Sequence, residues 1–490
     1  MNNFDKNFHV NFSPLYIAVA VMLGLCVAFD TKADEIEEVI VIAQEVKEVQ
    51  ADPLEDNTLI EAIMPTFTWP AGGYGGFVGF NERGAQTVHT SVYVNGIPAN
   101  EPGSGWYDFA HDFSAGQDVK IVSGANGVLY GSGSIAGTVL IEENILKGMT
   151  FTNASNEGEL LRPQYIRFAP VEAFEVSKIN VNNFSVRNDN DEVDHYNSLS
   201  SRINVDLGDF RIIAKISEYT YDYDNCYNYD FQSSNDCVQD GERYNIAIRN
   251  KFITFGRNYN NADYFTNDIS NNGTYTHQDQ TYSNESYRDY IRVAHHIDLS
   301  KNLNIDFGLD GEKLYYKTNS WSNIPNMVEE QVAIEVPAVF YGEGDVDQEI
   351  PLWQGFYEPS GEFNTIYVPD GTSTLTESEN VYNDENVGIF FQANAKFILE
   401  YNFGIRLGND DQNALRLGIQ QGPFYMNVGN SFRKPTLYEL YGDNWVDGNA
   451  ELDPEEGIGV EFGYGAISVF RYEFDQTIDY QPGYSNQVAT

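Results

Sequence analysis

Two groups of residues in this chain have the types and spacing to bind a small molecule or an ion. Gly131, Gly133 and Ala136 fit a relaxed dinucleotide-binding fingerprint, which requires a strand before it and an opening helix after it. A β-branched strand is predicted in place of that helix, so we expect no nucleotide site here. Asn188–Asp194 (N-D-N-D-E-V-D) offers the oxygen ligands that hard cations prefer, although it lacks the order of an EF-hand loop. This run is the candidate for a loop-bound divalent cation.

Catalytic chemistry is not indicated by the remaining residues. The seven histidines are scattered, and the one adjacent pair, His295-His296, would point to opposite faces of a strand. The sequence contains no G-x-S-x-G, H-E-x-x-H or G-x-x-x-x-G-K-[ST] motif and no Cys/His cluster. We therefore predict that the chain is not an enzyme and holds no metal centre or cofactor of its own.

The N-terminus and the cysteines indicate an exported protein. Lys6 precedes the apolar run Leu15–Phe29, and Thr31 and Ala33 place small residues at positions −3 and −1 of a cleavage after Ala33, as in a secretory signal peptide over residues 1–33. Fifteen apolar residues are too few for a comfortable membrane-spanning helix, which needs about 20. After cleavage only Cys226 and Cys237 remain, and in an exported chain they are expected to form a loop disulfide. Two free thiols or a metal pair are the alternatives.

Length and charge limit the partners of the mature chain. The 490 residues suffice for two or three domains. The formal net charge of −45, from 28 basic and 73 acidic residues, repels nucleic acids and anionic lipid surfaces. We therefore expect no nucleic-acid partner.

The elements that surround the glycine-rich segment indicate a role other than nucleotide binding. The strand-like runs Val119–Val122 and Thr138–Ile141 flank a segment with five glycines from Gly124 to Gly137, in which no helix is expected. This order closely resembles the plug domain of TonB-dependent outer-membrane receptors. The resemblance extends, in the family's order, to an R-G pair and to an N-G-I-P turn. Its motif residues here are Arg83, Gly84, Asn95, Gly96, Gly124, Gly127, Gly131, Gly133 and Gly137.

An acidic arm precedes this plug-like region. Residues 34–57 are rich in carboxylates, and their one apolar island could add as a strand to a partner's sheet edge. The island resembles the TonB box, and the resemblance implies binding to the TonB energising protein of the inner membrane. The box residues are Glu38, Val39, Ile40, Val41, Ile42 and Ala43. By the same resemblance, residues 58–145 form the plug domain.

Residues 146–490 have the pattern of a transmembrane β-barrel. Apolar and polar residues alternate over Leu303–Leu309 and Phe397–Leu407, and long polar stretches join such segments. The segments 432–441 and 448–455 resemble the F-R-x-P-[ST]-x-x-E-L-[YF] and G-N-x-x-L-x-P-E elements of the same receptors. The expected fold is therefore mostly β, an N-terminal α/β plug inside an antiparallel barrel. Barrels of this family have 22 strands, and too few residues follow Pro454 for the last of them, so we expect the barrel to be incomplete.

The resemblance implies a Gram-negative outer-membrane receptor. It would use TonB to take up a scarce nutrient such as a ferric siderophore, haem or cobalamin. A passive porin or a surface adhesin is the alternative, since neither needs a detachable plug, and a soluble secreted β-rich binding protein is a third. Aromatic residues of the long loops are candidate ligand contacts, with a membrane-interface girdle or loop packing as the alternative role. These residues are Tyr221, Tyr223, Tyr227, Tyr229 and Trp321.

Overall fold

The structure of the protein, a computed structural model, describes most of the chain after the acidic arm. The described residues are 46–50, 67–71, 76–111, 117–152, 164–182, 195–222, 226–227, 233–234, 237–267, 279–337, 357–409, 412–443, 446–465, 467–480 and 483–487. The predicted signal segment, the box Glu38–Ala43 and the run Asn188–Asp194 lie outside these residues and stay predictions.

The first sheet is built from residues expected to form the plug, together with β1, which lies within the segment 34–57 expected to be the acidic arm. We call the described residues 46–145 the plug. Its five strands lie in the order β1-β6-β7-β4-β5, with β4 parallel to β7 and the other neighbours antiparallel. Branched apolar residues of the strands meet in a core that includes Val92, Ile121 and Val139. The strands are β1 Val46–Gln50, β4 Thr90–Val94, β5 Ile97–Pro98, β6 Gln117–Ser123 and β7 Gly137–Glu143, beside the separate hairpin β2 Phe67–Ala71 and β3 Phe77–Asn81.

The glycine-rich connection from β6 to β7 differs from the sequence expectation in one respect. It contains a single-turn helix, α3 (Gly127–Tyr130), where no helix was predicted. The turn forms because the amides of Leu129 and Tyr130 bond to the carbonyl of Asn126, and it ends at Gly131, whose φ of 64° breaks the helix. The prediction was wrong because the three residues between Gly127 and Gly131 carry enough side chains for one helical turn. The β-branched strand predicted afterwards is present as β7.

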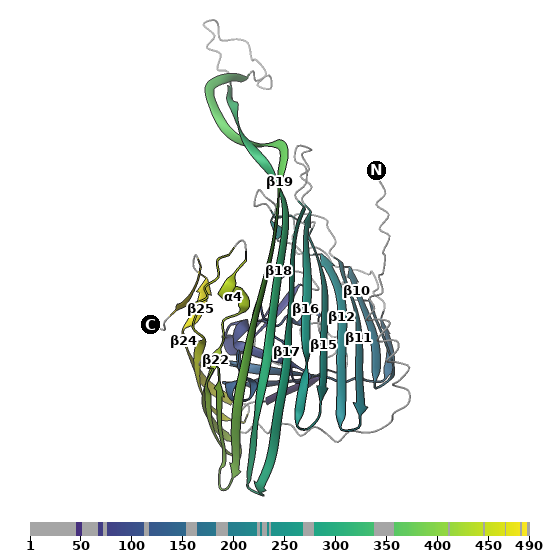
Figure 1. Ribbon diagram of the computed structural model, residues 1–490, viewed down its shortest axis with the longest axis vertical. Coiled ribbons are helices and arrows are strands. Elements are labelled where there is room, and N and C mark those ends of the chain that lie inside the picture. The colour runs from purple at the N-terminus through teal and green to yellow at the C-terminus, as the bar shows by residue number, and fades with distance from the viewer. Residues whose placement is uncertain are drawn as a thin grey trace, which may run out of the picture.

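The second sheet has fifteen antiparallel strands, and we call it the wall. It runs in sequence order from β8 to β24, which places neighbours in the chain side by side (Figure 1). Its strands are β8 Gly148–Thr152, β9 Gln164–Val171, β10 Phe174–Asn182, β11 His195–Leu207, β12 Phe210–Asp222, β15 Cys237–Arg249, β16 Ile253–Asn267, β17 Asp279–Ser300, β18 Leu303–Pro337, β19 Tyr357–Lys396, β20 Glu400–Gly408, β21 Ala414–Gln421, β22 Phe424–Arg433, β23 Glu455–Tyr464 and β24 Ile467–Asp475.

Burial alternates along the wall strands because one face points to the plug and the other points outward. In β23 every second residue is buried, whereas Ile458, Val460 and Phe462 are exposed on the outer face. The predicted alternation over Leu303–Leu309 falls within β18. The alternation predicted from Phe397 is partly wrong, since residues 397–399 form the turn between β19 and β20. Within the described ranges no helix has the length and apolar character needed to cross a membrane.

The two ends of the wall differ. At one end very short connections join the strands, for example between Leu207 and Phe210 and between Ser300 and Leu303. At the other end lie long connections, small hairpins and the helix α4 (Figure 1). Outer-membrane barrels place short turns in the periplasm and long loops outside. We call the second end the loop end. Its small elements are β13 Cys226–Tyr227, β14 Ser233–Ser234, α4 Leu437–Tyr441, β25 Thr477–Tyr480 and β26 Tyr484–Gln487.

The plug lies inside the curve of the wall. Figure 1 shows its purple strands between the yellow strands β22 and β24 and the blue-green strands β10 to β12. Side chains of the plug reach wall strands on both of these sides, as the contacts of Arg83 and Glu143 show. Long-range pairing of this kind makes the wall a scaffold that positions the plug residues.

Candidate functional site

One contact between plug and wall is built on Arg83. This residue lies in the short turn η1 (Glu82–Gly84) and adopts a φ of 53°, which aims its side chain at β23 and β24. Its guanidinium donates to Glu461 Oε1 at 2.6 Å and to Tyr472 Oη at 3.0 Å, and it stacks 4.5 Å from the centre of the Phe470 ring. Burial alone would lower the pKa of Arg83, but the hydrogen bond to Glu461 and its charge raise it. Arg83 is therefore a fixed cation held by the wall.

The two distal motifs come together beside this contact. Glu455, the last residue of the G-N-x-x-L-x-P-E element, accepts from Arg433 Nε at 2.7 Å and lies 2.7 Å from His89 Nε2 of the plug. Arg433 also donates to Glu439 Oε2 at 2.8 Å, and Glu439 completes a capping box with Thr436 at the start of α4. Sequence reasoning missed His89 and Glu455. Their polar side chains inside otherwise structural motifs were the available signal.

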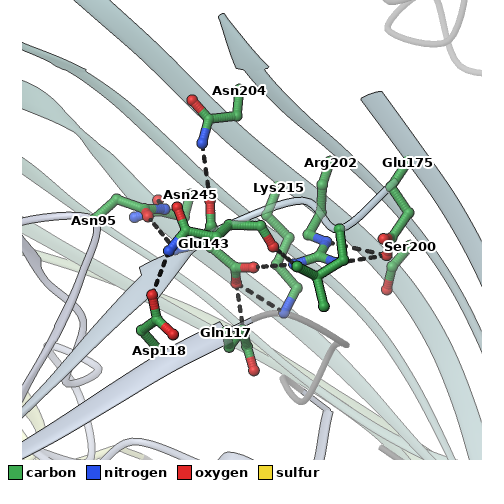
Figure 2. A network of polar contacts seen from close by, with 12 residues as sticks. Asn95, Gln117, Asp118, Glu143, Glu175, Ser200, Arg202, Asn204, Lys215 and Asn245 are labelled. Carbon is green, nitrogen blue, oxygen red and sulfur yellow. Dashed lines mark hydrogen bonds and ion pairs between the residues drawn. The ribbon is translucent and has the colours of Figure 1, made fainter. Parts of the chain in front are cut away.

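A second contact has the opposite polarity. Glu143, at the end of β7, accepts from Arg202 Nη1 at 2.8 Å, lies 3.2 Å from Lys215 Nζ and accepts from Gln117 Nε2 at 2.7 Å (Figure 2). Arg202 also binds Glu175 of β10 at 2.6 Å. Here the plug supplies the carboxylate and the wall supplies the cations, the reverse of the Arg83 contact. No sequence motif marked these residues, because the partners lie on different strands and far apart in the chain.

The predicted turn Asn95-Gly96 joins β4 to β5 and also contacts the wall. Asn95 and Gly96 have φ values of 53° and 81°, which suit a tight turn between antiparallel strands. The Asn95 amide donates to Asn245 Oδ1 at 2.7 Å, and its Oδ1 accepts from the backbone amide of Glu143 at 2.9 Å. The turn residue therefore connects the second plug contact to β15.

The glycine-rich segment packs closely against the other side of the wall. A Cβ on Gly127 would lie 2.5 Å from Ser431 Oγ, and the amide of Gly133 donates to the carbonyl of Phe432 at 2.9 Å. Gly124, with a φ of 93°, donates to Ala136, and Gly137 begins β7. The absence of side chains lets the plug backbone approach β22.

A cavity of about 260 Å³ lies between the plug and the wall. Its plug side is the loop after β5, with Glu101, Trp106 and Asp108, and its wall side is formed by β12, β15, β16 and β17. The wall residues that line it include Tyr221 and Tyr264, which lie in the halves of their strands nearest the loop end. The size is close to the lower end of small-molecule pockets, about 300–1,000 Å³. The position suits a ligand that arrives from the loop end.

Aromatic rings and charged groups line the cavity or pack directly beside its lining residues. His111 of the turn η3 (Phe109–His111) stacks on Tyr219 with ring centres 3.6 Å apart. Arg243 donates to the Asp108 carbonyl at 2.8 Å and lies 3.4 Å from its carboxylate. Burial raises the pKa of Asp108, and the charge of Arg243 lowers it only in part. Sequence reasoning missed these residues, although the acidic loop N-E-P-G-S-G-W-Y-D stands out among the plug segments.

Only some of the predicted ligand-contact and disulfide residues fall within the part of the chain that the structure describes. Tyr221 lines the cavity, whereas Tyr223 and Tyr229 lie outside the described residues. Tyr227 and Trp321 belong to β13 and β18, with side chains outside the described set. Cys237 is buried and disulfide-bonded, while its pairing with Cys226 stays a prediction.

Metal ligands do not gather in the part of the chain that the structure describes. No group of three or more His, Cys, Asp or Glu residues there could hold a metal ion. His296 contacts Asp306 at 2.6 Å, whereas the ring of His295 lies beside Phe252 and Phe307, on the other face of β17.

Comparisons with known proteins match both parts of the chain. Residues 34–138 match the family model TonB-dependent Receptor Plug Domain, and residues 180–490 match TonB dependent receptor-like, beta-barrel. The second match alone covers more than half of the chain. A comparison with curated proteins finds no match.

Solved structures resemble the chain in fold. The siderophore receptor PiuA from Acinetobacter baumannii is 14% identical with a TM-score of 0.54, over 91% of this chain and 74% of that chain. The pyoverdine outer membrane receptor FpvA from Pseudomonas aeruginosa is 11% identical with a TM-score of 0.53, over 91% and 73%. The copper transporter OprC is 12% identical with a TM-score of 0.55, over 93% and 76%. At these identities the likeness concerns the fold alone.

Proposed function

Because this chain belongs to the TonB-dependent receptors, which are outer-membrane transporters of Gram-negative bacteria and not enzymes, we propose that it takes up a scarce nutrient with energy from TonB. The proposed cargo is a metal chelate such as a ferric siderophore, or haem or cobalamin. Of the structures similar in fold, one is a siderophore receptor, one is a pyoverdine receptor and one is a copper transporter, so a metal-bearing ligand is the first to test.

The cavity between plug and wall is the observation that carries this proposal. It is lined by both parts, so a bound ligand would contact residues that move relative to each other if the plug shifts. A passive pore would not need its ligand site on a removable element. The ligand would bind between the loop after β5 and the strands β12 to β17, and plug movement would then open its path.

The energy would enter through the box Glu38–Ala43. A strand of the partner would pair with this apolar island, and a pull on it would act on the chain just before β1 (Val46–Gln50). β1 is an edge strand of the plug sheet and pairs only with β6 among the described residues, so a pull on it has to separate one strand pair. The pull would therefore reach the plug core through β6.

Deletion of Glu37–Ala43 tests the proposal. We expect the variant to bind its ligand with unchanged affinity and to lose energy-dependent uptake, since the box lies outside the cavity. Deletion of the equally long segment 52–58 of the same region is the control and should retain uptake. The measurements are ligand binding to purified protein and uptake of labelled ligand by cells, over a panel of ferric chelates, haem and cobalamin. Unchanged uptake after deletion of the box would favour a passive porin or an adhesin and overturn the proposal.

A further inference from the structure

The charge of the cavity indicates which ligands it accepts. We infer that it takes a ligand with little or no negative charge that carries an ammonium group, and that Glu101 of the plug receives this cationic donor. This inference rests on the proposed function, since it names the class of cargo for the same cavity.

Each cation that lines the cavity already has a carboxylate partner. Arg243 lies beside Asp108, and Lys215 lies 3.2 Å from Glu143, which it shares with Arg202. Arg288 of β17 forms an ion pair with Glu312 of β18. A polyanionic ligand would have to break one of these ion pairs to gain a cation, which leaves the partner carboxylate uncompensated in the cavity wall.

Glu101 is the exception among the charged groups of the cavity. It lies in the loop after β5, where its Oε2 accepts from Ser104 Oγ at 2.6 Å. Its Oε1 is buried and has no hydrogen-bond partner, and no basic side chain forms an ion pair with it among the described residues. Buried carboxylate oxygens without a partner are costly, so they mark a place for a donor that is brought by a ligand.

The electrostatics of the plug loop agree with this geometry. Burial raises the pKa of Glu101 and Asp108 adds to the rise, while hydrogen bonds from Ser104 and Ser286 and the charge of Arg243 lower it only in part. The carboxyl therefore lacks the full compensation that a directly paired cation would give. A ligand ammonium beside Oε1 would supply it.

Two further polar atoms of the same cavity define the rest of the ligand. The Oδ1 atom of Asn284 is buried without a partner and would accept a second donor. The Nε atom of Arg288 also lacks a partner and would donate to a carbonyl or hydroxyl oxygen. Trp106 and several tyrosines offer flat apolar contacts. This set fits a ligand with both amide-like groups and an amine, such as a hydroxamate chelate.

The whole chain favours the same class of ligand. With a net charge of −45, its field repels polyanions such as ferric tris-catecholates and attracts cations. The field affects the rate of encounter, whereas Glu101 affects the bound state. The two effects therefore act in the same direction at different distances.

A set of three iron chelates tests the inference. The first is a ferric tris-hydroxamate with a free terminal ammonium, the second is the same chelate with this amine acetylated, and the third is a ferric tris-catecholate. Binding to full-length protein in detergent is measured by titration calorimetry at pH 7.5. We expect the ammonium chelate to bind about tenfold or more tightly than its acetylated form, as for a hydrogen bond between charged groups, and the tris-catecholate to bind most weakly.

Two variants assign the preference to the predicted atom. Glu101→Gln keeps the size of the side chain and the acceptor for Ser104, and it should make the ammonium and acetylated chelates bind equally. Glu473→Gln on β24, with a side chain 61% exposed and outside the cavity, should keep the preference. Equal binding of both hydroxamates to the unaltered protein, or tight binding of the tris-catecholate, would overturn this inference while the uptake proposal stands. Failure of every chelate, haem and cobalamin to bind would overturn the proposed function and this inference with it.

Discussion

Single buried side chains give the plug its separate contacts with the wall. Arg83 places a cation of the plug against Glu461, whereas Glu143 places a carboxylate of the plug against Arg202 and Lys215. Ions at such positions are stable only when they are paired, because the cost of removing them from water is several kcal/mol each. Each contact therefore specifies where the plug sits, and a ligand or a pull that separates one pair must compensate for it.

His111 makes the plug contact with β12 sensitive to pH. Burial, and in second place the charge of Arg243, holds the pKa of His111 well below 6.5. The groups that face it are Tyr196, Tyr219, Tyr221, Asp108 and Arg243. Below pH about 6.5 a released His111 takes up a proton and a docked one does not, so docking weakens as the pH falls. One such group changes the free energy by about 1.4 kcal/mol per pH unit.

Hydrogen exchange of the plug amides near His111 measures this effect at pH 7.5 and 5.5. Protection corrected for intrinsic exchange should fall at the lower pH in the unaltered protein, and His111→Phe, which keeps a stacking ring, should lose this part of the pH dependence. Asp108 and Glu101 act in the opposite direction, since burial raises their pKa values, so that the docked plug binds protons more readily. Both are present in the two proteins, so the comparison reports the change at His111 together with its coupling to Asp108, which lies 3.5 Å from the ring. An identical pH dependence in His111→Phe would contradict the assignment.

Among the elements, the glycine-rich connection between β6 and β7 contributes to stability because its backbone lies close to the wall. The helix α3 starts at Gly127, which faces Ser431 of β22 and Ala414 of β21. Side chains larger than hydrogen do not fit between these strands and the plug backbone. The capping box of α4 fixes the adjacent loop-end segment, so β22 has little freedom to move away.

Gly127→Val should destabilise the docked plug by about 1–3 kcal/mol, the usual cost of overpacking. The matched control is Gly311→Ala on β18, where the nearest atom to a new Cβ lies 3.6 Å away and the substitution should be tolerated. Thermal unfolding of both purified variants in detergent gives the comparison. If Gly127→Val melts together with the control, the close approach at α3 does not contribute to stability.

At the scale of the whole molecule, the plug is held at opposite sides by contacts of opposite polarity. The Arg83 contact uses β23 and β24, and the Glu143 contact uses β11 and β12, at the other side of the wall in Figure 1. Because the two contacts share no residue, their contributions should add. A pull on β1 would act on both through the plug sheet.

Glu461→Gln and Glu143→Gln remove one charge from each contact without a change in side-chain size. Each should lower the free energy of plug opening by up to about 3–5 kcal/mol, the range for a broken buried pair. In both variants one arginine keeps a second carboxylate, since Arg83 also lies beside Glu82 and Arg202 beside Glu175. The double variant should lose the sum. Native-state hydrogen exchange of plug amides supplies the free energies, and a double variant that opens no more easily than either single one would mean that the contacts act as one unit.

Local features were readable from the sequence because they depend on neighbouring residues. The alternation of strands such as β18, the turn at Asn95-Gly96 and the β-branched strand after Gly137 follow from side-chain period and backbone sterics. These features, together with motif order, were sufficient for the fold class and the family. The one-turn helix α3 was missed because it depends on only three residues between Gly127 and Gly131.

Only the tertiary structure decided which side chains meet. The partner of Arg83 lies 378 residues away and that of His89 lies 366 residues away, and no local pattern records such pairs. The cavity likewise combines one plug loop with four wall strands, so its uncompensated Glu101 could not be distinguished from other acidic residues in the sequence. The sequence by itself determined the periods, the turns and the charge of the chain, because these are set by neighbours. The structure alone determined the ion pairs and the ligand cavity, because strand register brings distant residues together.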